Sequence, residues 1–501
     1  MKNSTIIFLF LNLYRFLWWL ALPILKKNAR LHEGLKERTS SDHLKKADIW
    51  IQGASAGESN LTVQLVEKLH SEIIIKEPII NNRYSNQPPK ILLTSTTAQG
   101  ISILSRLKMQ SNILLSKQKN FINITWFPFD IPDLMERVIC KVKPALIVLI
   151  ETELWPSLLF AAKKYGVKVI VVNGRLSKKS HRNYMLTRWL WNKLQPDTIL
   201  AISDRDAQKF RDIFPASYID VMPNMKFDSI LYDSEKLNLT LPSDIKILPI
   251  INKASQTIKR FSFINVSPAN TPISILASVR REEEDDVIVI IDQIIKKFPR
   301  QLICLFPRHQ HRIDFWKKTL TKKEQKWILR SDLEQFRNKN IELNKLFTAT
   351  NNKDNNTAKE VLKNNSQIEG VSLGTVILWD IFGELKDAYA ISTSTVAFVG
   401  GSLKPLGGHN FIEPLIAGVP TVTGPFTDDF AWVGEELFNN CKIFGDNIIK
   451  RAESRDEVIN FMVNSLTSTP NKSDIINKSI KYIEKKQGGT SIVCNTIKHY
   501  I

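Results

Sequence analysis

Short, uniformly apolar runs alternate with segments of helical hydrophobic periodicity along most of this chain. The runs lie at 47–54, 90–94, 145–150, 167–173 and 198–202 in the first half, and at 273–277, 302–306, 376–378, 396–399 and 421–423 in the second. Strands that are apolar throughout are buried on both faces, which is typical of a parallel sheet covered by helices. The chain is therefore predicted to be an α/β protein with two doubly wound domains.

Two polar stretches interrupt this pattern. Residues 229–270 contain several prolines and lack clear periodicity, and residues 340–368 are rich in asparagine and lysine. The predicted organisation is a membrane anchor with a basic flank at 1–46, a first domain at 47–235, a linker or insertion at 236–270, a second domain at 271–481 and a tail at 482–501. Because doubly wound sheets bind ligands at the carboxyl ends of their strands, we expect the site in a cleft between the two domains.

The N-terminus carries an apolar run over residues 6–25, interrupted only by Asn12, Arg15 and Pro23. About twenty apolar residues suffice for one bilayer crossing. An arginine near the middle of a span is costly, so an anchor lying in the plane of the membrane stays open. A signal peptide is the alternative, although no small-residue cleavage site follows. Residues 1–46 hold nine Lys/Arg against three acids, and such positive flanks stay cytoplasmic, so the body is expected on the cytoplasmic side.

The net charge of the chain limits the classes of partner that it is expected to bind. Lys and Arg number 69 against 50 Asp and Glu, a formal net charge of +19, which favours a nucleic acid, an anionic membrane or a phosphorylated substrate. Lysines are spread along the chain without an RNA-binding motif or zinc finger, which argues against nucleic acid. The four cysteines lie far apart, which excludes a disulfide scaffold and a zinc ribbon.

Residues 398–426 hold the richest local motif. A predicted strand ends at Gly400 and Gly401, a glycine-bearing loop follows, and a helix begins near Asn410. Glycines allow backbone N–H groups to approach an anion, and a helix N-terminus adds a positive dipole. Glu413, in the first helical turn, is placed to accept hydrogen bonds from sugar or ribose hydroxyls. An ordinary strand-to-helix connection explains the same pattern.

Carboxylates follow two strands of the first domain. Ser55 and Glu58 have the spacing of a capping box, while the alternative role of Glu58 is a general base at the mouth of the cleft. Glu151 and Glu153 come just after the run at 145–150, where one of them could instead cap the next helix.

In the second domain, Arg308 follows a strand and is suited to meet a phosphate, and residues 380–385 form another loop-to-helix junction with a candidate anion-binding amide. The Asp204-Arg205-Asp206 triplet has the D-x-D form of metal-dependent sugar transferases, but it follows Ser203 at a predicted helix start. His309 and His311 lack an acidic or cysteine companion at usable spacing, so no metal site is predicted.

Several motifs occur together and in a fixed order: SAGE (55–58), ETELWPSLL (151–159), NGRLSKKS (173–180), NMKFD (224–228), PRH (307–309), FGEL (382–385) and FVGGSLKPLGGHNFIEP (398–414). In these motifs the chain resembles the 3-deoxy-D-manno-oct-2-ulosonic acid (Kdo) transferases of lipopolysaccharide biosynthesis. The resemblance runs from the N-terminal anchor to about residue 480, outside the two polar insertions.

The resemblance implies a GT-B glycosyltransferase, with two Rossmann-like domains and an interdomain cleft. The N-terminal domain would bind the acceptor, a lipid A precursor (lipid IVA), and the C-terminal domain the donor, CMP-Kdo. It further implies the cytoplasmic side of the cell inner membrane, an anionic membrane surface as partner, and neither cofactor nor metal. The alternative is a sugar-nucleotide epimerase of the same fold, or another membrane-bound sugar-nucleotide enzyme.

The resemblance also implies roles for individual residues. Glu58 corresponds to the proposed catalytic base, and Glu151 and Lys226 correspond to residues that support the transition state. The positions implied to contact CMP are Pro307, Arg308, Phe382, Gly383, Glu384, Asn410, Phe411, Ile412 and Glu413.

The chain departs from the family pattern in places. The family motif S-T-H-x-x-E-E is replaced at 278–284 by SVRREEE, so a histidine is missing and Arg280 stands in that loop. Phe382 replaces a methionine, and Phe411 and Ile412 replace proline and leucine.

Overall fold

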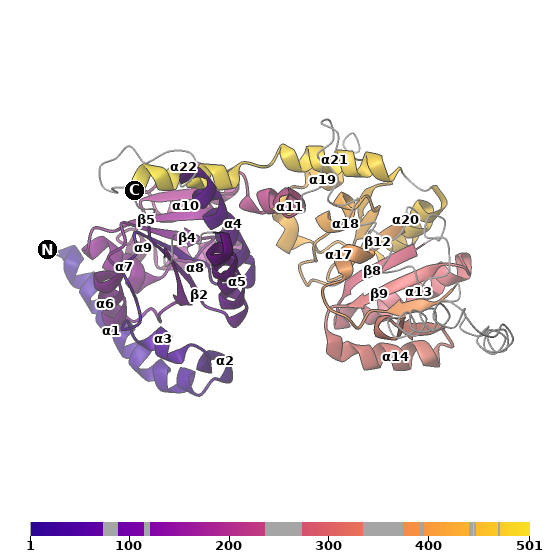
Figure 1. Cartoon of the computed structure of the whole chain (residues 1–501), viewed down its shortest axis with the longest axis horizontal. Coiled ribbons are helices and arrows are strands. Elements are labelled where there is room, and N and C mark those ends of the chain that lie inside the picture. The colour runs from indigo at the N-terminus through magenta and orange to yellow at the C-terminus, as the bar shows by residue number, and fades with distance from the viewer. Residues whose placement is uncertain are drawn as a thin grey trace, which may run out of the picture. The chain divides into compact units, whose positions relative to one another are not determined.

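The computed structural model describes residues 2–73, 89–114, 121–235, 273–333, 374–389, 395–439, 444, 447–468 and 471–501. The chain divides into a first unit, Met1–Tyr232 with Lys486–Ile501, and a second unit, Asp233–Lys485 (Figure 1). The predicted linker at 236–270 and the insertion at 340–368 lie outside the described residues.

The first unit is built on a seven-stranded parallel sheet with the order β3-β2-β1-β4-β5-β6-β7. Its strands are β1 (Ile49–Gln52), β2 (Ile91–Ser95), β3 (Ile122–Trp126), β4 (Leu146–Ile150), β5 (Lys168–Gly174), β6 (Thr198–Ala201) and β7 (Tyr218–Val221). Every strand predicted in the first half of the sequence is confirmed. The pattern missed β3 and β7, the two edge strands.

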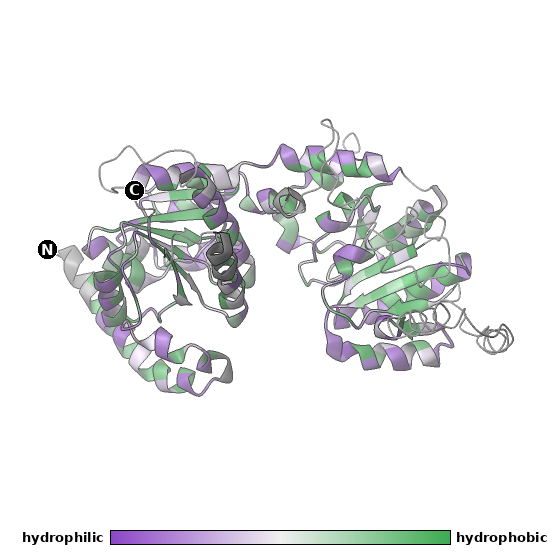
Figure 2. Ribbon diagram, viewed as in Figure 1, coloured by the Kyte–Doolittle hydropathy of each residue, from purple (hydrophilic) through white to green (hydrophobic). Residues whose placement is uncertain are grey.

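Helices cover both faces of this sheet. They are α1 (Lys2–Lys26), α2 (Ala29–His32), α3 (Leu35–Thr39), α4 (Ala56–Ile73), α5 (Ala98–Leu114), α6 (Pro132–Val142), α7 (Pro156–Lys164), α8 (Lys178–Leu186), α9 (Arg188–Trp191), α10 (Asp204–Ile213), α11 (Met225–Glu235) and α22 (Gly489–Tyr500). Side chains of β1 alternate between two cores, with Trp50 in one and Ile49 and Ile51 in the other. Such alternation explains why these strands are apolar throughout. Figure 2 shows the strands as mostly hydrophobic and the helices as mixed.

The C-terminal end of the chain belongs to the first unit. Val493, Cys494 and Ile497 of α22 are buried in the same core as Leu65 of α4. Asp228 fixes the start of α22, because its carboxylate accepts hydrogen bonds from the backbone N–H groups of Gly488 and Thr490, both at 2.7 Å. Residues 482–501, which the sequence analysis treats as a tail, thus comprise the end of α21 and a core helix.

The second unit repeats the same plan, with a seven-stranded parallel sheet in the order β10-β11-β9-β8-β12-β13-β14. Its strands are β8 (Ile273–Val279), β9 (Leu302–Pro307), β10 (Trp327–Leu329), β11 (Val376–Leu378), β12 (Thr395–Val399), β13 (Thr421–Thr423) and β14 (Ile449–Arg451). Its helices are α13 (Glu284–Lys297), α14 (Ile313–Lys322), α17 (Leu385–Ala388), α18 (Ile412–Ile416), α19 (Glu436–Asn439), α20 (Arg455–Ser468) and α21 (Lys472–Glu484), with short 3-10 turns η1 (Arg281–Glu283), η2 (Gln310–Arg312) and η3 (Asp428–Val433). The predicted α/β class with two doubly wound domains is confirmed.

Helix α1 has a docked side and an exposed side. On the docked side, the Tyr14 hydroxyl donates to Asp130 at 3.2 Å, and the Arg15 guanidinium donates to both oxygens of Asp133 on α6 at 2.6 and 2.8 Å. The Trp18 ring packs on Phe129, with centroids 5.4 Å apart. The exposed side carries apolar side chains at helical spacing, namely Leu9, Leu13, Phe16, Leu17, Leu20 and Ile24.

Candidate active site

The polar side chains of the first unit gather where its strand order reverses. β1 and β4 are neighbours in the sheet, and the chain continues outward from them in opposite directions, to β2 on one side and β5 on the other. Glu58 lies in the first turn of α4, just after β1, while Glu151 and Glu153 follow β4. This is the switch point at which doubly wound sheets bind their ligands.

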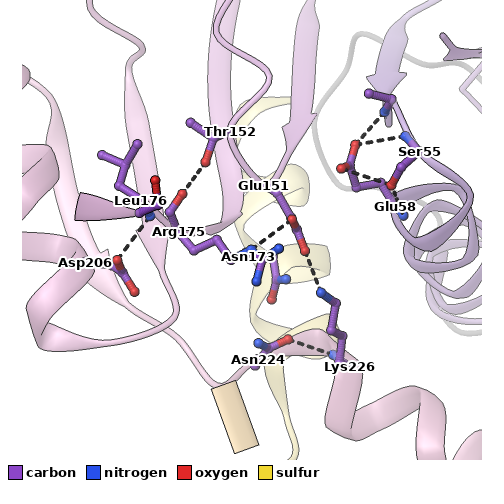
Figure 3. Close-up of polar contacts among 12 residues, drawn as sticks. Ser55, Glu58, Glu151, Thr152, Asn173, Arg175, Leu176, Asp206, Asn224 and Lys226 are labelled. Atoms are coloured by element: carbon purple, nitrogen blue, oxygen red, sulfur yellow. Dashed lines mark hydrogen bonds and ion pairs between the residues drawn. The ribbon is translucent and has the colours of Figure 1, made fainter. Parts of the chain in front are cut away.

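Glu151 is the anchor of this site (Figure 3). Its carboxylate is buried and accepts from the Lys226 ammonium of α11 at 2.7 Å and from Arg175 Nε at 3.1 Å. The backbone of Glu151 has a φ of 59°, a left-handed conformation that strains a residue with a Cβ. Two cations from different segments therefore converge on one buried carboxylate, and the two residues to which the resemblance assigns support of the transition state form an ion pair.

Glu58 forms the capping box that its spacing predicts. Its carboxylate accepts from the backbone N–H groups of Ala54 at 2.5 Å and Ser55 at 3.3 Å, and from the Ser55 hydroxyl at 3.1 Å. The Ser55 hydroxyl in turn accepts from the Glu58 N–H at 3.3 Å. Burial, and next the negative charge of Glu151, raise the pKa of Glu58 above its ordinary value. The residue is both a helix cap and a member of the carboxylate cluster.

Glu153 is a further member of the cluster, and no role of its own could be assigned to it from the sequence. Its Oε2 accepts from Gln52 Nε2 at 3.3 Å and from the Trp155 indole N–H at 3.0 Å. Burial, and next the charge of Glu58, raise the pKa of Glu153 to about 7. A carboxylate that titrates near neutrality is suited to proton transfer. Its position after a buried strand was the only signal in the sequence.

Asp204 and Asp206 lie at the start of α10, as predicted. The Ser203 hydroxyl caps this helix by accepting from the Asp206 N–H at 3.1 Å. The Asp206 carboxylate pairs with Lys209 at 2.8 Å and accepts from the Leu176 N–H at 3.1 Å. Because Leu176 follows Arg175 directly, Asp206 helps to hold the loop that presents Arg175 to Glu151. Within the described ranges, no three His, Cys, Asp or Glu side chains lie close enough together to hold a metal ion.

In the second unit, positive charge gathers at the carboxyl ends of β8 and β9. Burial, and next the charges of Arg308 and Arg280, lower the pKa of His409 to about 4. The Nε2 atom of His409 is buried without a hydrogen-bond partner among the described residues. Arg308 is exposed at the end of β9, where its N–H donates to the Val279 carbonyl at 2.8 Å. This arrangement is suited to an anion, as predicted for Arg308 next to Pro307.

The sequence predicts that backbone N–H groups of the glycine-bearing loop after β12 bind an anionic ligand, but the structure gives them another partner. Glu283, fully buried, accepts from the N–H groups of Gly401 at 2.5 Å, Ser402 at 2.8 Å and Leu403 at 2.8 Å. These amides are therefore bound by a carboxylate of the chain itself. Glu283 belongs to the segment SVRREEE, so the acidic part of that motif has a structural role.

Two of the remaining residues predicted to contact CMP, Glu384 and Glu413, form ion pairs. Glu384 pairs with the buried Arg330 at 3.0 Å, and its carboxylate also accepts from the Trp379 indole at 3.0 Å. Glu413 pairs with Lys386 of α17 at 3.4 Å, which brings the segments 382–385 and 410–413 together.

Five further residues complete that predicted set. Phe411 and Ile412 are buried as whole residues, so neither is exposed to a ligand in this structure. Asn410 Oδ1 accepts from the Ile412 N–H at 3.1 Å. Phe382 is 78% exposed and precedes Gly383, whose φ is 94°.

Comparison with known proteins agrees with the motifs. Residues 29–229 match the family model described as 3-deoxy-D-manno-octulosonic-acid transferase (kdotransferase). The 3-deoxy-D-manno-octulosonic acid transferases of Haemophilus influenzae and Bordetella pertussis are each 26% identical, covering 75% and 77% of this chain and 74% and 72% of those proteins. The resemblance predicted from the sequence is therefore confirmed.

A longer relative and a solved structure complete the comparison. A bifunctional glycosyltransferase/methyltransferase of Fusobacterium nucleatum is 25% identical over 85% of this chain and 54% of that protein, so the chain spans about half of its length. A crystal structure of a glycosyltransferase from Rickettsia africae has a TM-score of 0.50 at 12% identity, covering 91% of this chain and 98% of that one. The chain therefore has the two-domain glycosyltransferase fold and is a glycosyltransferase.

Proposed function

We propose that this glycosyltransferase, which is similar to the Kdo transferases, moves Kdo from CMP-Kdo onto a lipid A precursor. The observation that carries the proposal is the cluster of Glu58, Glu151 and Lys226 at the switch point of the first sheet. All three residues fall within the segment that matches the family model.

The proposed chemistry is a direct displacement at the anomeric carbon of Kdo. A hydroxyl of the acceptor forms the new C–O bond, the bond to the CMP phosphate breaks, and CMP leaves with the electron pair. Glu58 would take the hydroxyl proton. Its raised pKa makes the carboxylate a stronger base than an exposed glutamate, which suits this role. Lys226 and Arg175, held by Glu151, would supply positive charge beside it.

The donor would bind to the second unit. CMP-Kdo carries a phosphate and a carboxylate, and the positive charge of Arg280 and Arg308 reaches the half-buried His409 in that unit. Preorganised cations of this kind stabilise a departing phosphate. The exposed Phe382 and Gly383 are available to the nucleotide, which supports the predicted contacts at these two positions.

We further propose that α1 binds the cytoplasmic side of the inner membrane and lies in the membrane plane. The segment Leu9–Lys26 is long and apolar enough to cross a bilayer. Arg15 in its middle, however, pairs with Asp133 of α6, so a perpendicular crossing would carry charged residues of α6 into the hydrocarbon. The exposed apolar side of α1 fits an interfacial helix, and the exposed Lys26, Lys27, Lys45 and Lys46 suit an anionic surface.

The test of the proposed function is an acceptor-dependent reaction. Purified protein is incubated with CMP-Kdo and a tetra-acylated lipid A precursor, and CMP release is measured with and without the acceptor. Release that requires the acceptor, with a product that gains the mass of Kdo, supports the proposal. Conversion of a sugar nucleotide without any acceptor would favour the epimerase alternative instead. Mass spectrometry of the product also counts the Kdo units added.

A further inference from the structure

Lys226 lies in the first turn of α11, and two asparagines hold the start of this helix. The Met225 N–H donates to Asn173 Oδ1 of β5 at 2.9 Å. The Lys226 N–H donates to Asn224 Oδ1 at 3.0 Å (Figure 3). With its backbone held in this way, Lys226 reaches Glu151 at 2.7 Å through its ammonium group.

The start of α22 packs directly against the same segment. Gly489 lies so close to Pro223 that a Cβ would overlap the Pro223 carbonyl oxygen. The Asp228 carboxylate, in the first turn of α11, accepts from the N–H groups of Gly488 and Thr490 and from the Thr490 hydroxyl, all at 2.7 Å. The first turns of α11 and α22 therefore hold each other in place, although Asp228 and Gly488 are 260 residues apart in the sequence.

Helix α4 joins the same contact through Gln64. Its Nε2 donates to the Met225 carbonyl at 3.2 Å and also to the Thr490 hydroxyl oxygen. Because a carbonyl can only accept, the amide nitrogen of Gln64 is the atom that faces Met225. Gln64 and Thr490 are both buried, so these hydrogen bonds are shielded from water.

The Thr490 hydroxyl connects the other two side chains in a fixed direction. An ionised carboxylate can only accept, so this hydroxyl donates to Asp228 and accepts from Gln64. We refer to Gln64, Asp228 and Thr490 as the polar clamp. It joins α4, whose first turn carries Glu58, to α11, whose first turn carries Lys226.

We propose that Thr490 is a positioning residue for Lys226 and acts through the other two members of the polar clamp. Without its hydroxyl, Gln64 loses an acceptor and Asp228 loses a donor, and the first turn of α11 is held less firmly against α4. A misplacement of about 1 Å can cost about 100-fold in rate. The role in transfer rests on the proposed function, whereas the polar clamp is a property of the folded chain.

The test compares Thr490→Val with Thr490→Ser in the full chain in detergent, with CMP-Kdo and a lipid A precursor as substrates. Valine keeps the shape of threonine without the hydroxyl, and serine keeps the hydroxyl. We expect Thr490→Val to lower kcat about tenfold or more and Thr490→Ser to keep at least about half of it. The KM for CMP-Kdo should not change, because the donor is proposed to bind the second unit. Full activity in Thr490→Val would overturn the proposal.

Lys498→Met is the matched control. Lys498 of α22 pairs with Glu72 of α4 at 2.9 Å, so this ion pair joins the same two helices. It lies about two helical turns from Thr490 and does not involve α11. Lys498→Met should therefore keep its kcat even where it lowers the unfolding temperature. An equal loss of kcat in Lys498→Met and Thr490→Val at equal loss of stability would show a merely structural role and overturn the proposal.

A double-mutant cycle with Lys226→Met tests whether Thr490 acts through Lys226. Thr490→Val should lower kcat about tenfold in the wild type but less than about twofold in Lys226→Met, because the side chain that it positions is then absent. A general loss of packing would instead reduce the rate by the same factor in both backgrounds. Equal factors would overturn the proposal.

The unfolding temperatures of the same proteins provide a readout that does not need transfer. Thr490→Val should lower the unfolding temperature less in Lys226→Met than in the wild type. Where Lys226→Met is too slow to assay, equal shifts would overturn the proposal. If Thr490→Val does not fold, Gln64→Met removes the same hydrogen bond from the side of α4 and replaces it in the cycle. Unequal shifts in proteins that transfer no Kdo would refute the proposed function and leave the polar clamp standing.

Discussion

At the residue scale, Glu58 carries two roles in one carboxylate. Its local sequence predicts a helix cap, the family resemblance implies a base, and the structure contains the cap within a cluster of half-buried and buried carboxylates. Local spacing could not decide between these roles, because a capping box needs the same residues. The cluster itself arises from β1 and β4 becoming neighbours, and a local pattern does not contain that information.

Glu58→Gln should abolish transfer while donor binding and folding persist. Glutamine can still accept the Ala54 and Ser55 hydrogen bonds through its amide oxygen, but it cannot take a proton from the acceptor. We expect a rate loss of about 100-fold or more, which a radiolabelled Kdo-transfer assay measures.

Ser55→Ala is the matched control for that variant. It removes the hydroxyl from the cap and keeps the carboxylate, so it should cost about 1 kcal/mol of stability with most activity retained. If Glu58→Gln keeps more than about a tenth of the wild-type rate, Glu58 is only a cap.

Lys226→Met should lower both stability and transfer. It leaves the buried Glu151 with Arg175 as its remaining ion-pair partner among the described residues, and removing one partner from a partly buried pair costs about 1–3 kcal/mol after allowance for solvent. Thermal unfolding and transfer rate are measured side by side. The double variant Glu151→Gln with Lys226→Met should regain stability but not activity. Recovery of activity in the double variant would show that Lys226 serves Glu151 alone and has no part in transfer.

At the element scale, the apolar pattern found the interior strands and missed the edges. The missed strands are β3, β7, β10 and β14, which lie at the two edges of each sheet. An edge strand has one neighbour and less cover, so its side chains are more polar and more exposed. Three of the four residues of β7 are exposed, for example, whereas all of β1 and β4 is buried. The strands that position the site could therefore be predicted, because they are the most buried ones.

Asp130 connects α1 with the start of α7, a contact that the local sequence patterns do not indicate. It is buried, and its carboxylate accepts from the N–H groups of Ser157 and Leu158 at the start of α7, both at 2.9 Å, and from the Tyr14 hydroxyl of α1. Burial raises the pKa of Asp130 to about 7 from its ordinary 3.8. The folded chain thus binds this proton more tightly than the unfolded chain, so the stabilisation is complete below about pH 4 and is lost as the pH rises towards 7.

Asp130→Asn should remove that pH dependence. Its single amide oxygen cannot accept all three hydrogen bonds, so the variant should be less stable than wild type. The stability advantage of wild type should be larger near pH 5 than near pH 8, by at most about 3 kcal/mol. Chemical unfolding in detergent at both pH values measures it, and an equal advantage at the two values would contradict the prediction.

At the scale of the whole molecule, the two units and their sheets could be predicted from the sequence. The packing of the two terminal helices against segments that are distant in the sequence could not. α22 is amphipathic, so a helix could be predicted there, but no local signal says that it packs against α4 more than 400 residues away in the sequence. The docking of α1 is similar. An apolar run indicates a membrane as a candidate partner, but the contacts of Tyr14 and Arg15 with Asp130 and Asp133 restrict how the helix could meet it.

The exposed and docked sides of α1 should differ in their effects on membrane binding and on stability. Changing Leu13, Leu17 and Leu20 to glutamate places charges on the exposed apolar side, and this should release the protein from anionic vesicles while thermal unfolding stays unchanged. Tyr14→Phe, on the docked side, is the control and should lower stability by about 1 kcal/mol with vesicle binding retained.

A spanning helix and an in-plane helix also differ in where the N-terminus lies. In spheroplasts, a protease added outside would cut an N-terminal tag if α1 crosses the bilayer, because the basic flank after it is expected to keep the body in the cytoplasm. The ion pair between Arg15 and Asp133 requires the middle of α1 to stay at the level of α6, outside the hydrocarbon core. We therefore expect the tag to survive, and its cleavage would show that α1 leaves α6 to cross the membrane.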